Sequence, residues 1–354
     1  ALDDVAVWSQ ALTVDAIGYL SSGHAVPAAQ SDPNPLAIVQ QPQDKTALVG
    51  SRATFEVVRS GGTPPVSYQW KHNGVNIEGA TGSRLFVRVE PEAAGTYSVV
   101  VQDTVRSIES DPATLTIASL PTDPAESLLW GLTAHWPLDD GLSNPDTPVV
   151  ADAQGANNGA LFGGSAAAWL VEPQARFGGA LHLDGQNVYG VVSNSTTMDI
   201  NENQVTVALW ARLEQLPTDL PAAYGAIYDS TTDNYVLYLD RGNHELRFKV
   251  TTADSQAARP GIPEAELVLN EWIHVAGVYD GNATLEGGQA RIYLNGALKD
   301  TEGSASLTGL VMPGQVAGLG RNGADAANFF TGTLDDIGVW NRALTEAEIT
   351  YLAS

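Results

Sequence analysis

The sequence predicts an all-β chain that contains two antiparallel sandwiches in succession. Short runs in which apolar and polar residues alternate occur through most of the chain, and Gly, Asn and Pro turns separate them. Strand and helix patterns do not alternate, which argues against a parallel sheet covered by helices. A 22-residue segment that occurs at both ends indicates a tandem arrangement of related domains.

The composition narrows the classes of partner. The 354 residues are enough for two or three domains, and 44% of them are hydrophobic, so each domain can bury a core. A net charge of -24 makes nucleic acid and anionic membrane surfaces poor partners, because both attract cationic proteins. The chain has no cysteine, which excludes disulfides and thiolate metal sites. No long continuous apolar run occurs, so we expect no membrane span.

The repeated segment comprises residues 1–22 and 333–354, which are identical at 12 of 22 positions. Each copy carries the pattern LDDxxVWxxAL and predicts a strand followed by a short helix. Thr345 and Glu348 predict a capping box at the start of the second helix. We therefore expect the chain to be a window of a longer tandem protein, in which residues 1–22 end a preceding domain. Residues 1–20 should then dock on a neighbouring domain or chain, or be poorly ordered.

A linker at residues 23–35, with three prolines, leads to a β-patterned region at residues 36–118. Trp70 and Tyr97 lie in strand patterns, and Val57 and Val99 stand where alternation points into a core. The region resembles an immunoglobulin-like domain, with Trp70 as the strand-C tryptophan and Tyr97 as the tyrosine corner. Valine occupies both cysteine positions, so the resemblance implies an apolar contact in place of the disulfide.

A second linker at residues 119–126 precedes one long β-rich unit at residues 127–354. Six phrases occur there in order: WPLDDG, FGGALHLDGQNVYGVV, VTVALWAR, EWIHVAGVYD, IYLNG and LDDIGVWNRAL. They resemble the laminin-G-like, concanavalin-A-like jelly-roll family of bacterial surface and secreted proteins. The resemblance implies an antiparallel jelly-roll sandwich after the immunoglobulin-like sandwich, in an extracellular or cell-surface protein.

The same resemblance implies a structural calcium ion where the first and last strands meet. Asp139 or Asp140 on the entry strand, Asp184 before Gly185, and Asp336 on the exit strand match the expected carboxylates. Oxygen ligands from distant points of the chain suit a cation that takes about six to eight of them. The alternative is that Asp184 belongs only to a turn and Asp336 only to a solvated surface.

A shallow carbohydrate site is the second candidate. Alternation places Trp210 and Arg212 on the strand face opposite to Leu209, and the strand EWIHVAG contributes His274. Tyr238 of NYVLYLD completes this candidate set. An aromatic ring stacks on sugar C–H groups while Arg or His bonds the hydroxyl groups. The alternative is that these side chains are packing residues.

The sequence carries no motif of a known catalytic class. It lacks a Glu-x-Asp-x-x-Glu strand, a Gly-x-Ser-x-Gly elbow and a His-Glu-x-x-His helix, and Glu264 and Glu266 follow prolines in a predicted loop. We therefore expect a non-catalytic part of a large modular protein that binds a polysaccharide or cell-surface glycan. The alternative is a structural spacer of an adhesin, stalk or filament, whose partners are neighbouring domains or chains of a tandem array.

Overall fold

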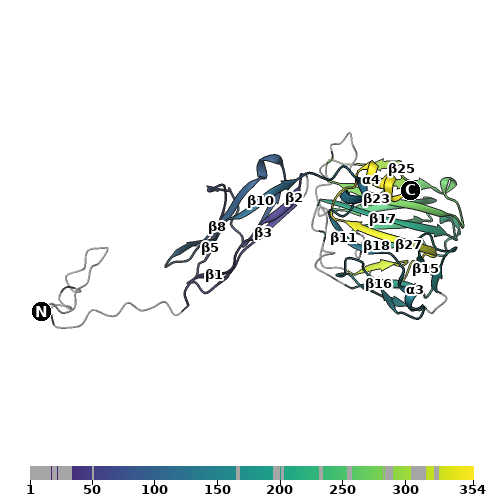
Figure 1. Cartoon of the computed structure of the whole chain (residues 1–354), viewed down its shortest axis with the longest axis horizontal. Helices are drawn as coiled ribbons and strands as arrows, with labels where there is room; N and C mark the ends of the chain where they lie inside the picture. Colours follow the sequence, from purple (N-terminus) through teal and green to yellow (C-terminus); the bar gives the residue numbers. More distant parts are fainter. Residues whose placement is uncertain are drawn as a thin grey trace. The chain divides into compact units, whose positions relative to one another are not determined.

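The structure is a computed structural model of the chain. It describes residues 34–49, 52–164, 168–193, 203–230, 234–252, 257–281, 290–303, 316–322 and 327–354, and single residues 17, 22, 200 and 283. The chain divides into two compact units (Figure 1). The first contains 53–87, 94–116 and the described residues up to Lys45, and the second contains 46–52, 88–93 and 117–354. The main parts of the two predicted sandwiches therefore fall in different units.

The first predicted sandwich is built from short strands. One sheet has the order β2-β10-β8-β5-β6 with β9 paired to β8, and two further pairs are β1-β4 and β3-β7. The elements are β1 (Ala37–Gln40), β2 (Lys45–Leu48), β3 (Arg52–Glu56), β4 (Val58–Ser60), β5 (Ser67–His72), β6 (Val75–Asn76), β7 (Arg84–Arg88), the 3-10 turn η1 (Pro91–Ala93), β8 (Gly95–Gln102), β9 (Ser107–Glu109) and β10 (Ala113–Ala118).

Trp70 lies at the centre of this first sandwich. It is fully buried, and so is Val99, its partner in the register between β5 and β8. Val57, at the other predicted cysteine position, is also buried, so both positions belong to an apolar core. Tyr97 stacks on Phe55 with ring centroids 4.7 Å apart. The predicted cysteine-free, immunoglobulin-like sandwich is confirmed.

The second unit is the predicted jelly roll, in which two antiparallel sheets enclose one core. Within the described residues, its first sheet has eight strands in the order β14-β15-β27-β17-β23-β24-β25, with β11 paired to β27. Their bounds are β11 (Leu132–Trp136), β14 (Trp169–Val171), β15 (Gly179–Asp184), β17 (Gln204–Leu213), β23 (Trp272–Asp280), β24 (Ala290–Leu294), β25 (Ala297–Glu302) and β27 (Thr331–Trp340).

The second sheet has nine strands in the order β12-β13-β16-β26-β18-β19-β20-β21, with β22 paired to β20, again counting described residues. Their bounds are β12 (Val149–Val150), β13 (Gly159–Phe162), β16 (Tyr189–Val192), β18 (Tyr224–Ser230), β19 (Tyr235–Asp240), β20 (Glu245–Thr251), β21 (Ala257–Ala258), β22 (Gly261–Pro263) and β26 (Ala317–Leu319). Two 3-10 turns, η3 (Pro217–Asp219) and η4 (Glu264–Glu266), connect strands of this unit.

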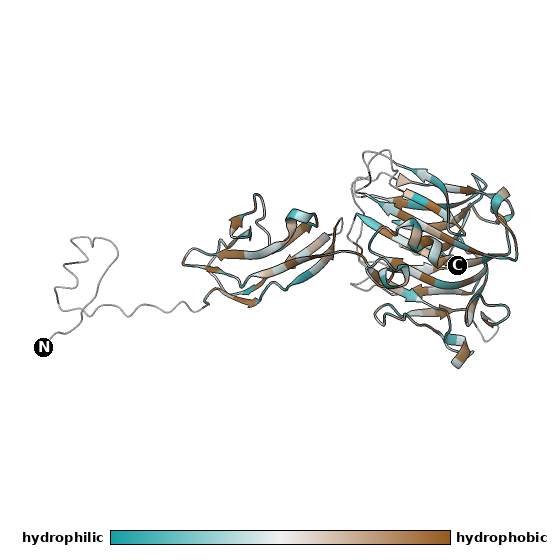
Figure 2. Cartoon of the chain, turned by 45° about the horizontal axis from the view of Figure 1, so that its top comes forward, coloured by the Kyte–Doolittle hydropathy of each residue, from teal (hydrophilic) through white to brown (hydrophobic). Residues whose placement is uncertain are grey.

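Period-two alternation determines which face of each strand meets the core. Five residues of β17 point between the sheets and are fully buried: Val205, Val207, Leu209, Ala211 and Leu213. Figure 2 shows that hydrophobic and hydrophilic residues are intermixed along the strands of both units. The residues between those five, including Trp210 and Arg212, lie on the outer face of the eight-stranded sheet, as predicted.

The described residues of the second unit also form three short helices: α2 (Pro124–Ser127), α3 (Asp140–Ser143) and α4 (Glu346–Leu352). The predicted capping box of α4 is confirmed. The Glu348 N–H donates to Thr345 Oγ1 at 3.3 Å, and the Thr345 N–H donates to Glu348 Oε2 at 2.8 Å. Among the described residues, no helix is both long enough and apolar enough to cross a membrane.

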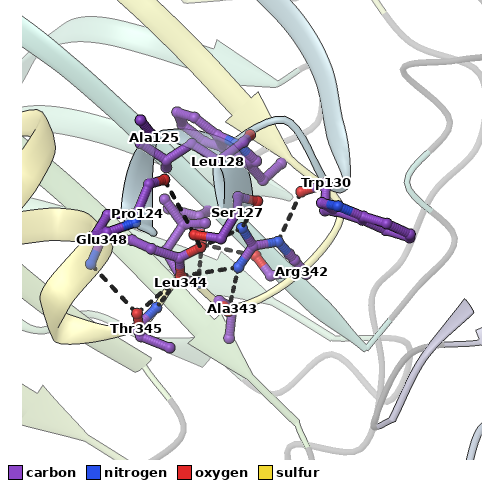
Figure 3. A network of polar contacts seen from close by, with 12 residues as sticks. Pro124, Ala125, Ser127, Leu128, Trp130, Arg342, Ala343, Leu344, Thr345 and Glu348 are labelled. Carbon is purple, nitrogen blue, oxygen red and sulfur yellow. Dashed lines mark hydrogen bonds and ion pairs between the residues drawn. The ribbon is translucent and has the colours of Figure 1, made fainter. Parts of the chain in front are cut away.

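A buried polar clasp joins α4 to the chain segment that enters the second unit (Figure 3). The Arg342 guanidinium donates to Glu348 Oε1 at 2.5 Å and to Glu348 Oε2 at 3.0 Å. It also donates to the backbone oxygens of Ser127 and Trp130, each at 2.7 Å. The Ser127 hydroxyl donates to Glu348 Oε1 at 2.7 Å. Because every polar group of the clasp finds a partner, the buried charges are compensated.

The first copy of the repeated segment lies outside the described residues, apart from Ile17 and Ser22. The expectation that residues 1–20 dock elsewhere or are poorly ordered therefore stays a prediction. The predicted domain limits also stay predictions.

Candidate functional site

Trp210 lies on the expected face but is covered by its neighbours. Only 5% of the residue is exposed. The Arg176 guanidinium carbon lies 4.2 Å from the centroid of the indole, and Phe177 meets that ring edge-on at 6.0 Å. Burial beneath these two side chains leaves little of the indole open to a stacking sugar. The structure therefore places Trp210 in a packing position, which was the alternative to a sugar platform.

Arg212 is also engaged within the domain. Its Nη2 donates to Thr333 Oγ1 at 3.1 Å, and its Nη1 donates to the Gln174 backbone oxygen at 3.4 Å. Its guanidinium carbon lies 5.7 Å from the centroid of the Trp272 ring. These contacts connect β17, β27 and the segment before β15, so they account for Arg212 without a ligand.

His274 pairs directly with Trp210 in the register between β17 and β23, and the two ring centroids are 5.4 Å apart. The residue is 2% exposed, and burial lowers the pKa of its imidazole to about 4 although the nearby Asp336 carboxylate opposes the shift. The imidazole is therefore neutral at pH 7. Within the described chain, its Nδ1 has no hydrogen-bond partner.

His274 lines a pocket of about 190 Å³ on the outer face of the eight-stranded sheet. His135 and Asp336 are its other ionisable residues, and His135 Nε2 lies 2.6 Å from Asp336 Oδ1. Leu128, Leu132 and Trp340 contribute to its mostly apolar walls. Of the four predicted carbohydrate ligands, only His274 reaches this pocket.

Asp335, the neighbour of Asp336, is fully buried beneath the same face. Its Oδ2 accepts hydrogen bonds from the N–H groups of Arg176 at 3.0 Å and Phe177 at 2.9 Å. Burial raises its pKa to about 7, with a smaller contribution from the charges of Asp336 and Asp139, while the two hydrogen bonds act in the opposite direction. These two hydrogen bonds to the Asp335 carboxyl group hold the segment of Arg176 and Phe177 over Trp210.

The predicted calcium ligands do not meet at one point. Asp139 Oδ1 accepts a hydrogen bond from the N–H of Gly179, the first residue of β15, at 2.6 Å. Asp184 is the last residue of the same strand, so the two ends lie roughly 17 Å apart at about 3.4 Å per residue. Calcium holds its ligands at about 2.3–2.6 Å. Asp139 and Asp184 therefore cannot bind one ion together, and the proposed set of three carboxylates is corrected.

Asp184 instead stabilises a turn. Its Oδ1 accepts hydrogen bonds from three successive backbone N–H groups, those of Gln186 at 2.9 Å, Asn187 at 2.7 Å and Val188 at 2.9 Å. The three N–H donors engage Oδ1 of this carboxylate in the turn. Across the described parts of the chain, no group of three or more His, Cys, Asp or Glu side chains is arranged to hold a metal ion.

Tyr238 lies on the other sheet, away from the remaining predicted ligands. It belongs to β19, where Leu237 and Leu239 point into the core and Tyr238 points outward. Tyr224 of β18 meets it edge-on at 5.8 Å. Together with Val236, Lys249 and Arg259, these two tyrosines line a pocket of about 180 Å³. We expected aromatic and hydrogen-bonding side chains to occur together beside Trp210, on the eight-stranded sheet. They occur together in this pocket of the nine-stranded sheet instead.

The pocket is one end of an aromatic strip that crosses the outer face of the nine-stranded sheet. The strip consists of Phe162, Tyr189, Phe329, Tyr224 and Tyr238. Ring centroids are 5.3 Å apart between Phe162 and Tyr189 and 5.8 Å apart between Tyr189 and Phe329. Phe329 bridges to Ala226, two residues from Tyr224 on β18. From β13 to β19 the strip spans four strand spacings, roughly 19 Å.

Polar side chains accompany the strip. The Arg321 guanidinium carbon lies 4.8 Å from the Tyr189 ring centroid, and Asn322 Nδ2 donates to the Tyr224 hydroxyl at 2.5 Å. Phe162 is 45% exposed, so its end of the strip is open to solvent. The sequence reasoning missed the strip, although YGAIYD and NYVLYLD both alternate tyrosine with apolar residues and could have indicated a pair of neighbouring strands.

Glu264 and Glu266 do not form a catalytic pair. They lie in η4, where Glu264 Oε2 accepts from the Thr218 N–H at 3.3 Å. Glu266 forms an ion pair with Lys299 at 2.7 Å. The two carboxylates thus have separate partners in a surface turn.

A family model matches part of the second unit, and two known proteins match parts of the chain. Residues 184–350 match the family model described as the concanavalin A-like lectin/glucanases superfamily. Endoglucanase C of Cellulomonas fimi is 31% identical over 115 residues, which are 31% of this chain and 10% of that protein. The decoration protein of Escherichia phage T5 is 33% identical over 107 residues, which are 29% of this chain and 62% of that protein. The chain thus spans less than two thirds of either relative.

Solved structures show a distant likeness to this chain at low sequence identity. The receptor-binding domain of botulinum neurotoxin C/D mosaic serotype is 14% identical with a TM-score of 0.47, over 63% of this chain and 51% of that one. The binding domain of botulinum neurotoxin serotype G is 14% identical with a TM-score of 0.47, over 63% of this chain and 50% of that one. The second unit of this chain, which matches the laminin-G-type family model over residues 184–350, is a concanavalin A-like jelly roll.

Proposed function

We propose that this chain is a non-catalytic binding module of an extracellular modular protein, and that its jelly roll binds carbohydrate through the aromatic strip of the nine-stranded sheet. The observation that carries the proposal is a set of five aromatic residues: the contacting rings of Phe162, Tyr189 and Phe329, and the pair Tyr224 and Tyr238 that lines the pocket. Sugar rings present flat C–H faces to aromatic rings and hydroxyl groups to polar neighbours.

The geometry favours a chain of sugars over a single sugar. A span of roughly 19 Å is longer than one sugar ring, and the strip runs across strands rather than down into the core. The pocket at its end has two tyrosines and two cationic side chains as possible hydrogen-bond donors. The family description, which names lectins and glucanases, supports a carbohydrate ligand.

The rival proposal is a structural spacer in a long adhesin, stalk or filament. The 332-residue offset between the two copies of the repeated segment supports it, because regular arrays use such repeats. Phe162 of the strip is exposed, Tyr189, Phe329 and Tyr224 are half-buried, and Tyr238 is buried. A spacer needs no such aromatic residues at a sheet face, and the strip therefore favours the binding role. Fold alone does not decide between these roles.

A glycan array with the intact chain tests the proposal. We expect binding to at least one polysaccharide, and calorimetry of that ligand with Tyr189→Ala should give at least a tenfold weaker affinity, about 1.4 kcal/mol. Phe86, which is 49% exposed on β7 of the first unit, provides the matched control. Phe86→Ala should bind like the unsubstituted chain. Absence of binding across plant, marine and microbial polysaccharides would leave the spacer as the better account.

A further inference from the structure

We infer that the pocket on the outer face of the eight-stranded sheet is a second ligand site, and that it holds a small alcohol or phenol with one hydroxyl group on an apolar body of about one ring. This is the pocket that His274, His135 and Asp336 line. It lies on the other sheet from the aromatic strip, so the inference is independent of the proposed carbohydrate function. Its walls, its polar end and its volume together indicate the class of ligand.

The walls of the pocket are mostly apolar side chains, namely Leu128, Leu129, Leu132, Leu352 and Trp340. Hydrogen bonds hold the segment that carries the first two leucines. The Arg342 guanidinium donates to the backbone oxygens of Ser127 and Trp130, each at 2.7 Å, on either side of them (Figure 3). Trp340 Nε1 donates to the Leu128 backbone oxygen at 2.8 Å. The apolar wall is therefore preformed, as the walls of ligand pockets usually are.

The polar end of the pocket consists of His274, His135 and Asp336. A β-bulge brings Asp336 there: the register between β17 and β27 shifts, and Leu334 and Ile337 both point into the core, so the two residues between them turn to the outer face. His135 Nε2 lies 2.6 Å from Asp336 Oδ1, and no described residue donates to Asp336 Oδ2. The two side chains are 32% and 34% exposed, so a ligand can reach this carboxylate.

His274 adds an unsatisfied polar atom to this end. The residue is 2% exposed, and its Nδ1 has no hydrogen-bond partner within the described chain. A buried polar atom without a partner destabilises the folded protein, and a ligand that supplies the partner recovers part of that cost. A neutral imidazole has one donor nitrogen and one acceptor nitrogen, so it can bond a group that donates, accepts or does both.

A hydroxyl group fits this polar end better than a charged group does. It can donate to Asp336 Oδ2, and it can donate to or accept from the imidazole of His274. A carboxylate would be repelled by Asp336. An ammonium would lose its hydration at the place where burial already lowers the pKa of His274 to about 4, although the Asp336 carboxylate opposes that shift. The pocket thus disfavours either charge on a ligand.

The rest of the ligand must be apolar and small. The pocket has a volume of about 190 Å³. A cavity of about 150 Å³ is enough to hold benzene, so this pocket has room for one ring and a substituent. The many hydroxyl groups of a sugar would meet leucine side chains here and would lose their hydrogen bonds to water without replacement. The ligand class therefore differs from that of the aromatic strip.

Four probes of similar shape test the hydroxyl group on the intact chain. Benzyl alcohol, ethylbenzene, benzylammonium and benzoate share a phenyl ring and differ in the group attached to it. Titrations followed through the amide resonances of the protein give each affinity and locate each probe. We expect benzyl alcohol to bind about three- to tenfold more tightly than ethylbenzene, and more tightly than either ion. Tighter binding of an ion, or no binding of any probe, would overturn the inference.

Three variants connect the binding to this pocket. His274→Phe keeps a buried ring and removes both ring nitrogens, so benzyl alcohol should lose its advantage while ethylbenzene still binds. Leu129 is 71% exposed, so Leu129→Ala should fold normally and bind benzyl alcohol about threefold more weakly. Leu142→Ala is the matched control, because Leu142 is 52% exposed on α3 and does not line the pocket. It should bind benzyl alcohol like the unsubstituted chain.

Two results with these variants would contradict the inference. One is an unchanged preference for benzyl alcohol in His274→Phe. The other is an equal loss of affinity in Leu129→Ala and Leu142→Ala, and this comparison holds even where His274→Phe does not fold. Neither result bears on glycan binding by the aromatic strip, so failure of the inference and failure of the proposed function are distinguishable.

Discussion

The guanidinium of Arg342 donates two hydrogen bonds to the carboxylate of Glu348, and both residues are buried. The pair connects the end of β27 to α4, and Ser127 extends it to the entry of the unit. Burial would raise the pKa of Glu348, but hydrogen bonds from Arg342, the Thr345 N–H and Ser127 lower it to about 2. In the first copy of the repeated segment, Gln10 and Ala16 occupy the corresponding positions, so both charges are replaced together.

The paired replacement leads to a prediction on stability. Arg342→Gln or Glu348→Ala alone should cost about 3–5 kcal/mol, because each leaves one buried charge without its partner. The double variant, which copies the first segment, should cost clearly less than the sum of the two. A double-mutant cycle by denaturant unfolding measures the difference. Additive costs would contradict the account of the clasp.

The buried carboxyl group of Asp335 predicts a specific pH dependence. Its pKa is raised to about 7 from an ordinary value of 3.8, so the folded state holds its proton more tightly than the unfolded state. The stability that it contributes is present below about pH 4 and is lost as pH rises to about 7. Asp335→Asn should remove this loss, a few kcal/mol at about 1.4 kcal/mol per pKa unit.

The comparison of Asp335→Asn with the unsubstituted chain must be made pH by pH, because His274 titrates in the same range. The pKa of His274 is lowered from 6.5 to about 4, so its contribution is present above 6.5 and is lost as pH falls towards 4. This term is common to both proteins and cancels in their difference. A constant difference in unfolding free energy from pH 4 to pH 8 would contradict the position assigned to Asp335.

Metal removal gives a third prediction. Because Asp139, Asp184 and Asp336 have separate partners and cannot share one ion, we expect the melting temperature in a chelator to equal that in millimolar calcium. Differential scanning calorimetry of the intact chain measures both. A melting temperature that rises with calcium, and no longer does so in Asp184→Asn alone or Asp139→Asn alone, would establish a metal site with a smaller ligand set than the sequence predicted.

Trp210 provides a fourth prediction, which separates packing from binding. Trp210→Ala removes a buried indole that contacts Arg176, Phe177 and His274, so it should cost about 3–5 kcal/mol of stability. Under conditions where the variant is folded, its affinity for glycan should not change. A loss of affinity in a variant with a native melting temperature would restore the outer face of the eight-stranded sheet as the site.

The sequence predicted the architecture well because its strongest signals are local. Alternation in β17 assigns each residue to a face, and the core positions Val57 and Val99 follow from the same period. The capping box of α4 needs only Thr345 and Glu348, three residues apart. Such patterns require no knowledge of how distant strands pair.

The candidate sites depended on distant pairing, and there the sequence was less informative. Alternation placed Trp210 on the outer face but could not indicate that the segment of Arg176 and Phe177 covers it. Alternation indicates which face of its strand Tyr238 occupies. It does not indicate to which sheet that strand belongs, because long-range strand pairing decides this. Asp184 illustrates a chemical ambiguity, because an aspartate before glycine suits a turn as well as a cation.

The most direct measurement is calorimetry of the best glycan ligand with Tyr238→Ala and Trp272→Ala. Both variants remove an aromatic side chain from the outer face of a jelly-roll sheet, and only Tyr238 belongs to the aromatic strip. We predict that Tyr238→Ala weakens binding at least tenfold and that Trp272→Ala leaves it unchanged. Loss of affinity in Trp272→Ala, with full affinity in Tyr238→Ala, would contradict the assignment of the binding face.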